Sequence, residues 1–371
     1  ASTLLDVSSC VSRYERQHIL PNFGRRVQEI IAHTHAIIVG VGALGCAAAD
    51  LAARAGIGRI TLLDRDLVEL SNLHRQTLFT ERDVAESLPK SEAARRRLAA
   101  INTSIQIEAI VADLTPLNAH QFFGRFAQDQ SEPALRSVIV DGTDNFETRF
   151  LLNDCAVKYG LPYAYAGVVG GEGTVMFVPP RRGPCLRCLG ELPGAGTVAT
   201  CDTVGVFGPA VTMAAAIQVA DLIAFLADRE GFRPRLTAFR LWSGRGDQPP
   251  TWRTIDVSGL GPSPECVCCG MSQYEFLESR RGASTESLCG QCAVQITPAS
   301  PSTIDLKSIG QKLAGIGTIG GNAFVLRASI ARAGFEGDRA ELILFSDGRA
   351  IIRGTSDVSL ARSAYAQWVG F

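Results

Sequence analysis

Gly40-Val41-Gly42-Ala43-Leu44-Gly45 is the stretch that decides the fold of this chain of 371 residues. It follows a short apolar run at 35–40 and opens an alanine-rich segment at 43–55. Glycines between a buried strand and a helix permit a tight turn, and the helix N-terminus then attracts a phosphate group. The stretch therefore predicts a nucleotide-binding α/β domain in which the phosphates lie against Gly40, Gly42 and Gly45.

Strand and helix patterns alternate around this turn. Apolar strands are predicted at 35–40, 59–64, 106–111 and 137–141. Helices are predicted at 43–55, 91–101 and 147–159. Buried strands that alternate with helices indicate a Rossmann-like, mostly parallel sheet that is covered on both faces.

From Tyr163 onward the pattern changes to an antiparallel extension of this sheet. Its predicted strands are 163–170, 173–179, 236–242 and 251–257, and a long helix over 212–227 interrupts them. We expect a large domain over 1–270, a polar linker over 271–303 and a small C-terminal α+β domain over 304–371. In the small domain, Asp347-Gly348 between two apolar runs predicts a hairpin, and Ser356 or Asp357 is predicted to cap a last helix that ends near Val369.

Composition excludes several classes of protein. The net charge of −1 and a pI near 6.6 do not suggest binding to nucleic acid or to an anionic membrane. The longest apolar stretch, 207–227, contains Gln218 and Asp221, so we expect a buried helix rather than a membrane span. Eleven cysteines and no secretory leader pattern favour thiol and metal chemistry in the reducing cytoplasm over a disulfide framework.

Charged residues after the glycine turn separate two kinds of nucleotide site. Asp64 suits a pair of ribose hydroxyls, and the glycine turn with this acid alone favours an NAD-dependent oxidoreductase. Arg75 and Lys90 suit a triphosphate, and Asp144, after a strand, suits Mg²⁺. Each of these is an ordinary surface charge if it is taken singly. Together they favour nucleotidyl transfer from ATP with Mg²⁺, which needs positioning and charge neutralisation.

Seven segments, in order along the chain, resemble the ThiF/MoeB/ubiquitin-activating superfamily. They are RYERQ (13–17), LPNFG (20–24), GVGALG (40–45), LLDRDLVELSNLHRQ (62–76), PKSEAARRRL (89–98), DGTDNFETRFLLND (141–154) and GPCLRCL (183–189). The resemblance extends from about Arg13 to Cys269, so the domain over 1–270 is similar to the adenylyltransferase domain of that family.

The resemblance implies a specific reaction. Such enzymes use ATP and Mg²⁺ to adenylylate the C-terminal glycine carboxylate of a ubiquitin-like sulfur carrier protein ending in Gly-Gly, and a sulfur donor acts next. By motif match, the ATP-site residues would be Gly42, Asp64, Asn72, Arg75, Lys90 and Asp144. Asp144 would be the metal ligand, and Arg16 would enter the partner's site in a homodimer.

Two Cys-x-x-Cys pairs, Cys185/Cys188 and Cys266/Cys269, predict a tetrahedral structural Zn²⁺ site. The family resemblance also implies zinc at this place. Cys268 is then an extra thiol, and Cys289/Cys292 is a rival second pair.

Cys201 lies in a Gly/Thr-rich segment before a helix, where the pKa of a thiol can fall. The resemblance implies a role in the sulfur step, because some family members form a thioester, persulfide or disulfide there. A spectator thiol is an equally good interpretation of the sequence. Cys10, Cys46 and Cys155 are expected to be thiols without partners.

The C-terminal segments 288–296, 341–357 and 361–368 resemble the extension of some ThiF-type proteins of thiamine-thiazole synthesis. This favours a ThiS-like carrier over a MoaD-like carrier or a carrier of another sulfur-transfer pathway. Two alternatives of other classes remain. One is the NAD-dependent oxidoreductase, and the other is a non-catalytic scaffold that binds the carrier, which would predict a broken ATP site.

Overall fold

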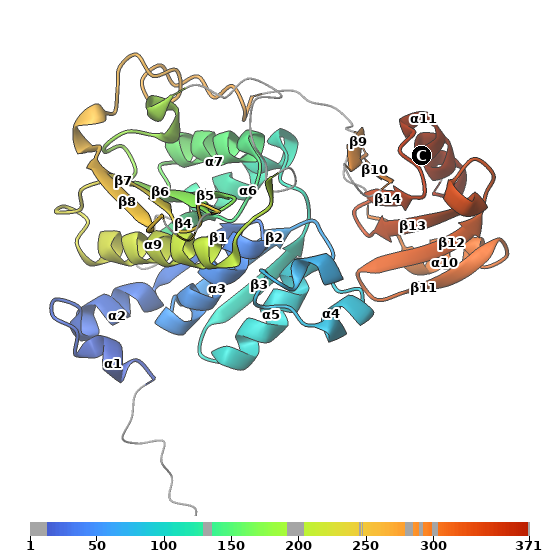
Figure 1. Ribbon diagram of the computed structural model, residues 1–371, viewed down its shortest axis with the longest axis horizontal. Helices are drawn as coiled ribbons and strands as arrows, with labels where there is room; N and C mark the ends of the chain where they lie inside the picture. Colours follow the sequence, from blue (N-terminus) through green and yellow to red (C-terminus); the bar gives the residue numbers. More distant parts are fainter. Residues whose placement is uncertain are drawn as a thin grey trace, which may run out of the picture. The chain divides into compact units, whose positions relative to one another are not determined.

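The computed structural model describes residues 13–128, 136–190, 204–244, 246, 248–278, 285–288, 292–298 and 303–369. The chain divides into two compact units, each with its own sheet (Figure 1). The first unit consists of Ala1–Asp66, Leu70–Thr80 and Lys90–Ser279. The second consists of Leu67–Glu69, Glu81–Pro89 and Arg280–Phe371.

The described residues of the first unit form an eight-stranded sheet. Its strands, in spatial order, are β3 (Gln106–Val111), β2 (Arg59–Asp64), β1 (Thr34–Val39), β4 (Arg136–Asp141), β5 (Tyr163–Val169), β6 (Glu172–Val178), β7 (Arg235–Arg240) and β8 (Thr251–Asp256). Pairing is parallel from β3 to β5 and antiparallel from β5 to β8. The predicted Rossmann-like sheet with an antiparallel extension is therefore confirmed.

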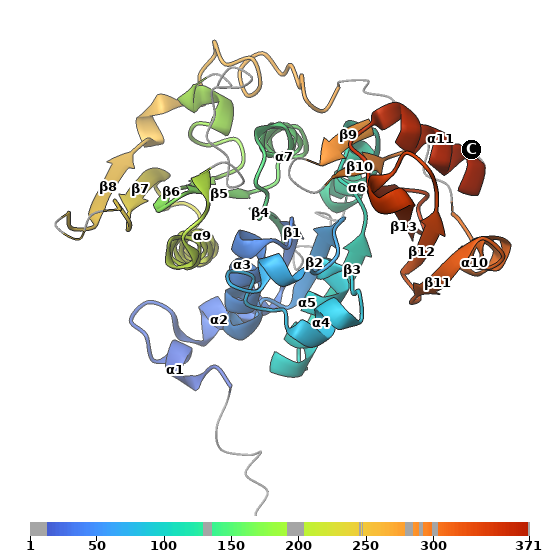
Figure 2. The same ribbon diagram turned by 45° about the vertical axis from the view of Figure 1, so that its right-hand side comes forward.

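Helices cover both faces of this sheet (Figures 1 and 2). One face carries α6 (Pro116–Gln128) and α7 (Phe146–Tyr159), and the other carries α3 (Ala43–Ala55), α5 (Lys90–Ile101) and α9 (Gly208–Ala227). Two short helices, α1 (Glu15–His18) and α2 (Gly24–Ala32), precede the sheet. Helix α6 was not predicted from the sequence; Pro116 occupies its first position and three phenylalanines supply its apolar face.

Helix α9 alone, among the described helices, has the length and apolar composition that would allow it to cross a membrane. It packs against α3, β5 and β6. Gln218 is fully buried, and its amide donates hydrogen bonds to the backbone carbonyls of Asp141 and Ala164. These contacts are those of a core helix, as the polar residues within the apolar stretch predicted.

The second unit contains an antiparallel sheet with helices packed on it, which confirms the small α+β fold. Its strand order is β11 (Gly317–Gly321), β12 (Val325–Ala331), β13 (Arg339–Phe345), β14 (Ala350–Arg353), β10 (Ala293–Ile296) and β9 (Thr285–Leu288). The hairpin of β13 and β14 is present as predicted. Helices α10 (Leu306–Leu313) and α11 (Val358–Trp368) pack on the sheet, and Asp357 caps α11 by accepting from the N–H groups of Ser359 and Leu360.

The linker predicted over 271–303 needs a correction, because β9 and β10 lie within it and pair with each other. Strand β10 also pairs with β14 and is fully buried. A four-residue strand is too short to give a periodic signal, so the polar residues around it dominated the sequence pattern.

Two short segments from the first third of the chain belong to the second unit. Helix α4 (Glu81–Ala85) lies in one of them. Arg327 Nη1 donates to Ser87 Oγ at 2.6 Å, and Asn322 Nδ2 donates to the carbonyl of Glu86 at 2.9 Å. Arg353 Nη2 pairs with Glu69 Oε1 at 2.6 Å. The second unit is therefore built from three separate stretches of sequence.

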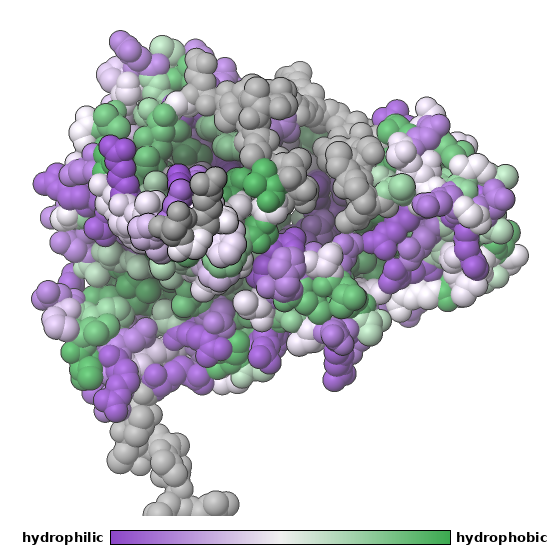
Figure 3. All heavy atoms as spheres, in the orientation of Figure 1, coloured by the Kyte–Doolittle hydropathy of each residue, from purple (hydrophilic) through white to green (hydrophobic). Residues whose placement is uncertain are grey.

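Hydrophilic and hydrophobic residues share the surface of the molecule. In the face drawn in Figure 3, hydrophilic and hydrophobic residues are mixed over the described part of the molecule. The net charge of −1 results from 36 basic and 37 acidic residues.

His35 is a buried polar residue at the centre of the parallel sheet. Its Nε2 lies 2.9 Å from Thr61 Oγ1, and its Nδ1 lies 3.3 Å from Ser137 Oγ. Burial, together with the nearby charges of Arg59 and Arg125, lowers the pKa of His35 to about 3. The ring is therefore neutral in the folded protein at any pH well above this value.

This histidine makes the protein sensitive to acid. The unfolded chain takes up a proton near pH 6.5 and the folded chain only near pH 3, so stability falls as the pH decreases between these values. One proton corresponds to a slope of at most about 1.4 kcal/mol per pH unit. In urea unfolding measured across this range, His35→Gln should lose stability less steeply than the wild type. Equal slopes for the two proteins would contradict this account.

Candidate active site

The loops after β1 and β4 meet in a contact that only glycine permits. A Cβ on Gly45 would lie 1.9 Å from the carbonyl oxygen of Gly40, and one on Gly142 would lie 2.1 Å from the same atom. Gly40 itself has a φ of +82°, which favours glycine. Helix α3 begins immediately after this turn, at Ala43. Its N-terminus and the loop after β4 therefore lie at one edge of the parallel sheet.

Asp64, at the end of β2, holds the glycine turn in place. Its Oδ2 accepts the N–H of Val41 at 2.6 Å, and its Oδ1 accepts the N–H of Asp66 at 2.7 Å. Burial raises the pKa of Asp64, whereas Lys90 acts to lower it. A carboxylate has about four lone-pair sites, so it retains capacity for the ribose contact that the sequence predicts.

Lys90 is a buried cation at the start of α5. Its Nζ donates to Asp66 Oδ2 at 2.9 Å. Burial acts to lower the pKa of Lys90, but the carboxylates of Asp66, Asp64 and Asp144 outweigh this and raise it above its ordinary value. The ammonium group is therefore charged and lies close to the glycine turn and to Asp144.

The segment that follows β2 brings further polar groups to the turn. Asn72 is buried at the end of a 3₁₀ turn (Leu70–Asn72), and Arg75 Nη1 donates to the carbonyl of Ser71 at 2.9 Å. A Cβ on Gly42 would lie 4.0 Å from Gln76 Nε2, and one on Gly208 would lie 4.0 Å from the Cβ of Arg75. The segment 72–76 therefore lies between the glycine turn and the start of α9.

Asp144 projects from the loop between β4 and α7. It is exposed, while its neighbours in the loop are fixed: Asn145 Oδ1 caps α7 by accepting the N–H of Thr148 at 2.8 Å. The charge of Asp144 contributes to the raised pKa of Lys90 and of Arg149. An exposed carboxylate beside a buried cation fits a metal ligand at the phosphates.

The remaining catalytic predictions have different outcomes. Arg16 is exposed on α1, as an arginine that acts in a partner subunit would have to be. Cys201 lies outside the described residues, as do Cys10 and Cys289. Cys46 and Cys155 are buried free thiols with raised pKa values caused mainly by burial, which fits inert core cysteines.

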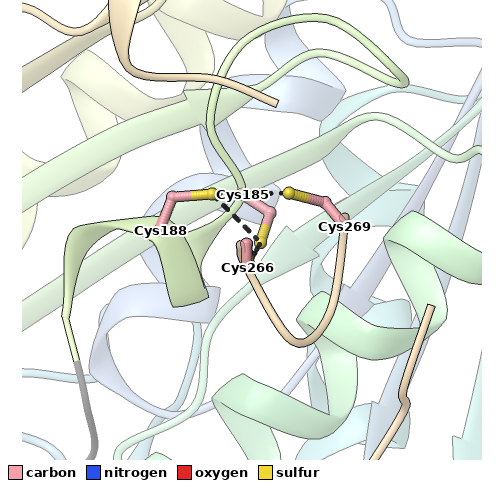
Figure 4. A group of neighbouring side chains, drawn as sticks. All are labelled: Cys185, Cys188, Cys266 and Cys269. Atoms are coloured by element: carbon pink, nitrogen blue, oxygen red, sulfur yellow. Dashed lines mark hydrogen bonds between the residues drawn. The ribbon is translucent and has the colours of Figure 1, made fainter. Parts of the chain in front are cut away.

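Four cysteines from two distant segments converge in the first unit (Figure 4). The sulfur atoms of Cys185, Cys188, Cys266 and Cys269 all lie within 4.8 Å of one another. Sulfur–sulfur distances are 3.7 Å for Cys185–Cys266 and 3.4 Å for Cys188–Cys269. Four ligands at a Zn–S distance of about 2.3 Å in a tetrahedron are separated by about 3.8 Å, so the cluster has the dimensions of a zinc site.

Helix α7 supports the two cysteine-bearing segments of this cluster through hydrogen bonds. Asn153 Oδ1 accepts the N–H of Leu186 at 2.8 Å, and Asn153 Nδ2 donates to Cys268 Sγ at 3.3 Å. Asp154 Oδ2 accepts the N–H of Phe276 at 2.9 Å. Cys268 therefore contacts α7 and is not one of the four clustered cysteines, which agrees with its prediction as the extra cysteine.

Several supporting residues were not singled out from the sequence. Asp66 and Asp141 stand inside quoted motifs, and a search for carboxylates next to Asp64 and Asp144 could have found them. Arg149 and Asn153 also stand inside a quoted motif, 141–154, and Arg149 contacts Thr143 only six residues away. Tyr163 contacts Asp141 from β5 and Asn153 contacts Leu186 from α7, and no local sequence signal marks such long-range contacts.

The comparisons with known proteins show the family of this chain. The model of the ThiF family matches residues 14–260. The chain belongs to the ThiF family. A sulfur carrier protein ThiS adenylyltransferase of Bacillus subtilis (strain 168) is 37% identical over 360 residues, which is 96% of this chain and 99% of that protein.

Other relatives support the same family. A sulfur carrier protein adenylyltransferase of Thermus thermophilus is 36% identical over 222 residues, covering 58% of this chain and 78% of that protein. A crystal structure of E. coli MccB with ATP superposes with a TM-score of 0.54 at 25% identity, covering 71% of this chain and 75% of that chain. The family predicted from the sequence motifs is therefore confirmed.

The glycine contact can be tested without any assay of function. Gly45→Ala should lower the free energy of unfolding by about 1–3 kcal/mol, because its Cβ has no room beside the Gly40 carbonyl. Gly124→Ala in α6 is the matched control, since its Cβ would meet only Tyr159 at 3.8 Å. We expect Gly124→Ala to be stabilising by about 0.5–1 kcal/mol. Equal effects in urea unfolding would contradict the contact.

Proposed function

We propose that this chain adenylylates the C-terminal glycine carboxylate of a ubiquitin-like sulfur carrier protein, using ATP and Mg²⁺. One observation carries the proposal: the glycine turn, the buried Lys90 and the exposed Asp144 lie at one edge of the parallel sheet, where open α/β sheets bind ligands. Membership of the ThiF family and the names of its relatives support the same reaction.

In this reaction the carrier carboxylate attacks the α-phosphate of ATP, and pyrophosphate leaves. The nucleophile is already an anion, so no general base is needed. Lys90 and Arg75 neutralise the phosphates, and Asp64 and Asn72 orient the nucleoside. Asp144 would hold Mg²⁺, which supplies further charge neutralisation at the phosphates.

The second substrate is proposed to be a ThiS-like carrier. Support comes from the relative of Bacillus subtilis, because the similarity covers 96% of this chain and therefore includes the second unit. We also propose that two copies of the chain form a homodimer in which Arg16 enters the partner's site. A sulfur donor then consumes the adenylate. The protein is proposed to be cytoplasmic. A MoaD-like carrier is the alternative that the same assay tests.

An NAD-dependent oxidoreductase is less well supported. It would use the glycine turn and Asp64, but it gives no function to Lys90. A buried ammonium ion needs partners, and the carboxylate of Asp66 supplies one. The phosphates of a nucleoside triphosphate would supply further anionic partners for the Lys90 ammonium group.

The proposed reaction is tested by ATP–pyrophosphate exchange with Mg²⁺ and a panel of small carriers ending in Gly-Gly. Exchange should require a ThiS-like carrier and should be absent without one. Exchange with a MoaD-like carrier alone would transfer the assignment to that pathway. Absence of exchange with every carrier would contradict the proposal.

Asp144→Ala should reduce this exchange by at least about a hundredfold, as expected for loss of electrostatic stabilisation at the reacting phosphate. Its fold should remain intact, because the side chain is exposed. Asp50→Ala is the matched control: Asp50 pairs with Arg54 on α3, and surface pairs of this kind contribute little. Near-normal exchange by Asp144→Ala would contradict its assignment.

We further propose that the four-cysteine cluster holds a structural Zn²⁺. Purified protein should contain one zinc per chain, and Cys266→Ser should lose it, together with thermal stability. Cys268→Ser is the matched control, because a hydroxyl can keep the contacts to Asn153 and Asp154. Loss of zinc from Cys268→Ser alone, measured by atomic emission, would contradict this ligand set.

A further inference from the structure

The loop that carries Asp144 is held by a buried hydrogen-bond network whose members have no direct part in the proposed reaction. The network is centred on Asp141, the last residue of β4, which is fully buried. Asp141 Oδ1 accepts the N–H of Thr143 at 2.9 Å and the hydroxyl of Thr143 at 2.7 Å. These two bonds fold the backbone immediately before Asp144 onto the carboxylate.

The other oxygen of this carboxylate has a donor from the neighbouring strand. Tyr163, on β5, donates its hydroxyl to Asp141 Oδ2 at 2.5 Å and is itself fully buried. Burial, together with the nearby Asp141 charge, raises the pKa of Tyr163 well above its usual value. The tyrosine therefore keeps its proton and remains a donor.

Helices on both faces of the sheet complete the network. From α7, Arg149 Nη2 donates to the carbonyl of Thr143 at 2.9 Å. From α9, Gln218 Nε2 donates to the carbonyl of Asp141 at 2.9 Å. Arg149 also supplies the positive charge that opposes the burial of Asp141. The loop is thus fixed from the strand below it and from both helix layers.

We propose that Tyr163 is a positioning residue for the metal site. Its hydroxyl fixes the Asp141 carboxylate, Asp141 fixes Thr143, and Thr143 sets the position of the Asp144 carboxylate. This inference rests on the proposed function, in which Asp144 holds Mg²⁺. Tyr163 is not proposed to contact the nucleotide or the metal. Its substitution should therefore change only the Mg²⁺-dependent binding that needs Asp144.

Tyr163→Phe should have a specific defect. Phenylalanine keeps the buried ring but leaves Asp141 Oδ2 without its donor, and an unsatisfied buried carboxylate oxygen seeks another partner. Thr143 is the adjacent donor, so the loop would shift where Asp144 begins. Binding of a nucleotide through Mg²⁺ should weaken, whereas binding through Lys90 and the glycine turn should not.

The experiment is a calorimetric titration of the zinc-loaded full chain with a non-hydrolysable ATP analogue, in buffer with Mg²⁺ and in buffer from which Mg²⁺ is omitted. Tyr163→Phe should bind the analogue about tenfold more weakly with Mg²⁺, which is about 1.4 kcal/mol. Without Mg²⁺ its affinity should match that of the wild type. Tyr159→Phe is the matched control: it also loses one tyrosine hydroxyl, which contacts His120 at 2.8 Å, and should bind as the wild type does.

A second pair of variants separates positioning from general destabilisation. In an Asp144→Asn background, Tyr163→Phe should cause no further loss of Mg²⁺-dependent binding, because the two residues act on one step. If Tyr163→Phe fails to fold, Thr143→Val removes the hydroxyl link of the same network and should show the same Mg²⁺-dependent loss.

The outcomes are distinct. Equal affinity of Tyr163→Phe and wild type with Mg²⁺, or equal losses with and without Mg²⁺, would overturn the positioning role. A wild-type chain whose binding of the analogue does not depend on Mg²⁺ would overturn both this inference and the proposed function. Mg²⁺-dependent binding without exchange on any carrier would overturn only the proposed function.

Discussion

The contact between the loops after β1 and β4 is the constraint on which the rest of the site depends. Gly45 and Gly142 both approach the carbonyl of Gly40 more closely than any side chain permits. This contact brings the start of α3, which attracts phosphate, next to the loop that carries Asp144. A parallel sheet supplies the common edge, and the glycines supply the close approach.

Buried charge then fixes what this edge can bind. Asp64 accepts backbone N–H groups of the glycine turn and of Asp66, and Asp66 pairs with Lys90. Such groups are costly to bury unless they are paired, so their geometry is tightly determined. Asp141 plays the corresponding part for the second loop, with Tyr163 as its donor. In both loops a buried carboxylate, Asp64 or Asp141, accepts hydrogen bonds from the backbone. A different residue, Lys90 or Asp144, is then proposed to contact the nucleotide or its metal.

The sequence predicted the fold where signals are local. Apolar strands that alternate with helices, the glycine turn and the Asp347-Gly348 hairpin are all present. It missed α6, and it assigned β10 to a linker, because a four-residue strand has no measurable period. Of the site, it named the motif residues but not Tyr163 or Asn153, since their contacts join positions more than twenty residues apart. Such partners are set by the register of β4 and β5 and by the packing of α7.

The most direct test of the account is a comparison of ATP with Mg²⁺ and NAD⁺ as ligands of the same purified chain. The glycine turn alone would accept either, whereas Lys90 and Asp144 together favour a triphosphate with a metal. The account predicts saturable binding of ATP that requires Mg²⁺ and no comparable binding of NAD⁺. Tight binding of NAD⁺ without binding of ATP would contradict it.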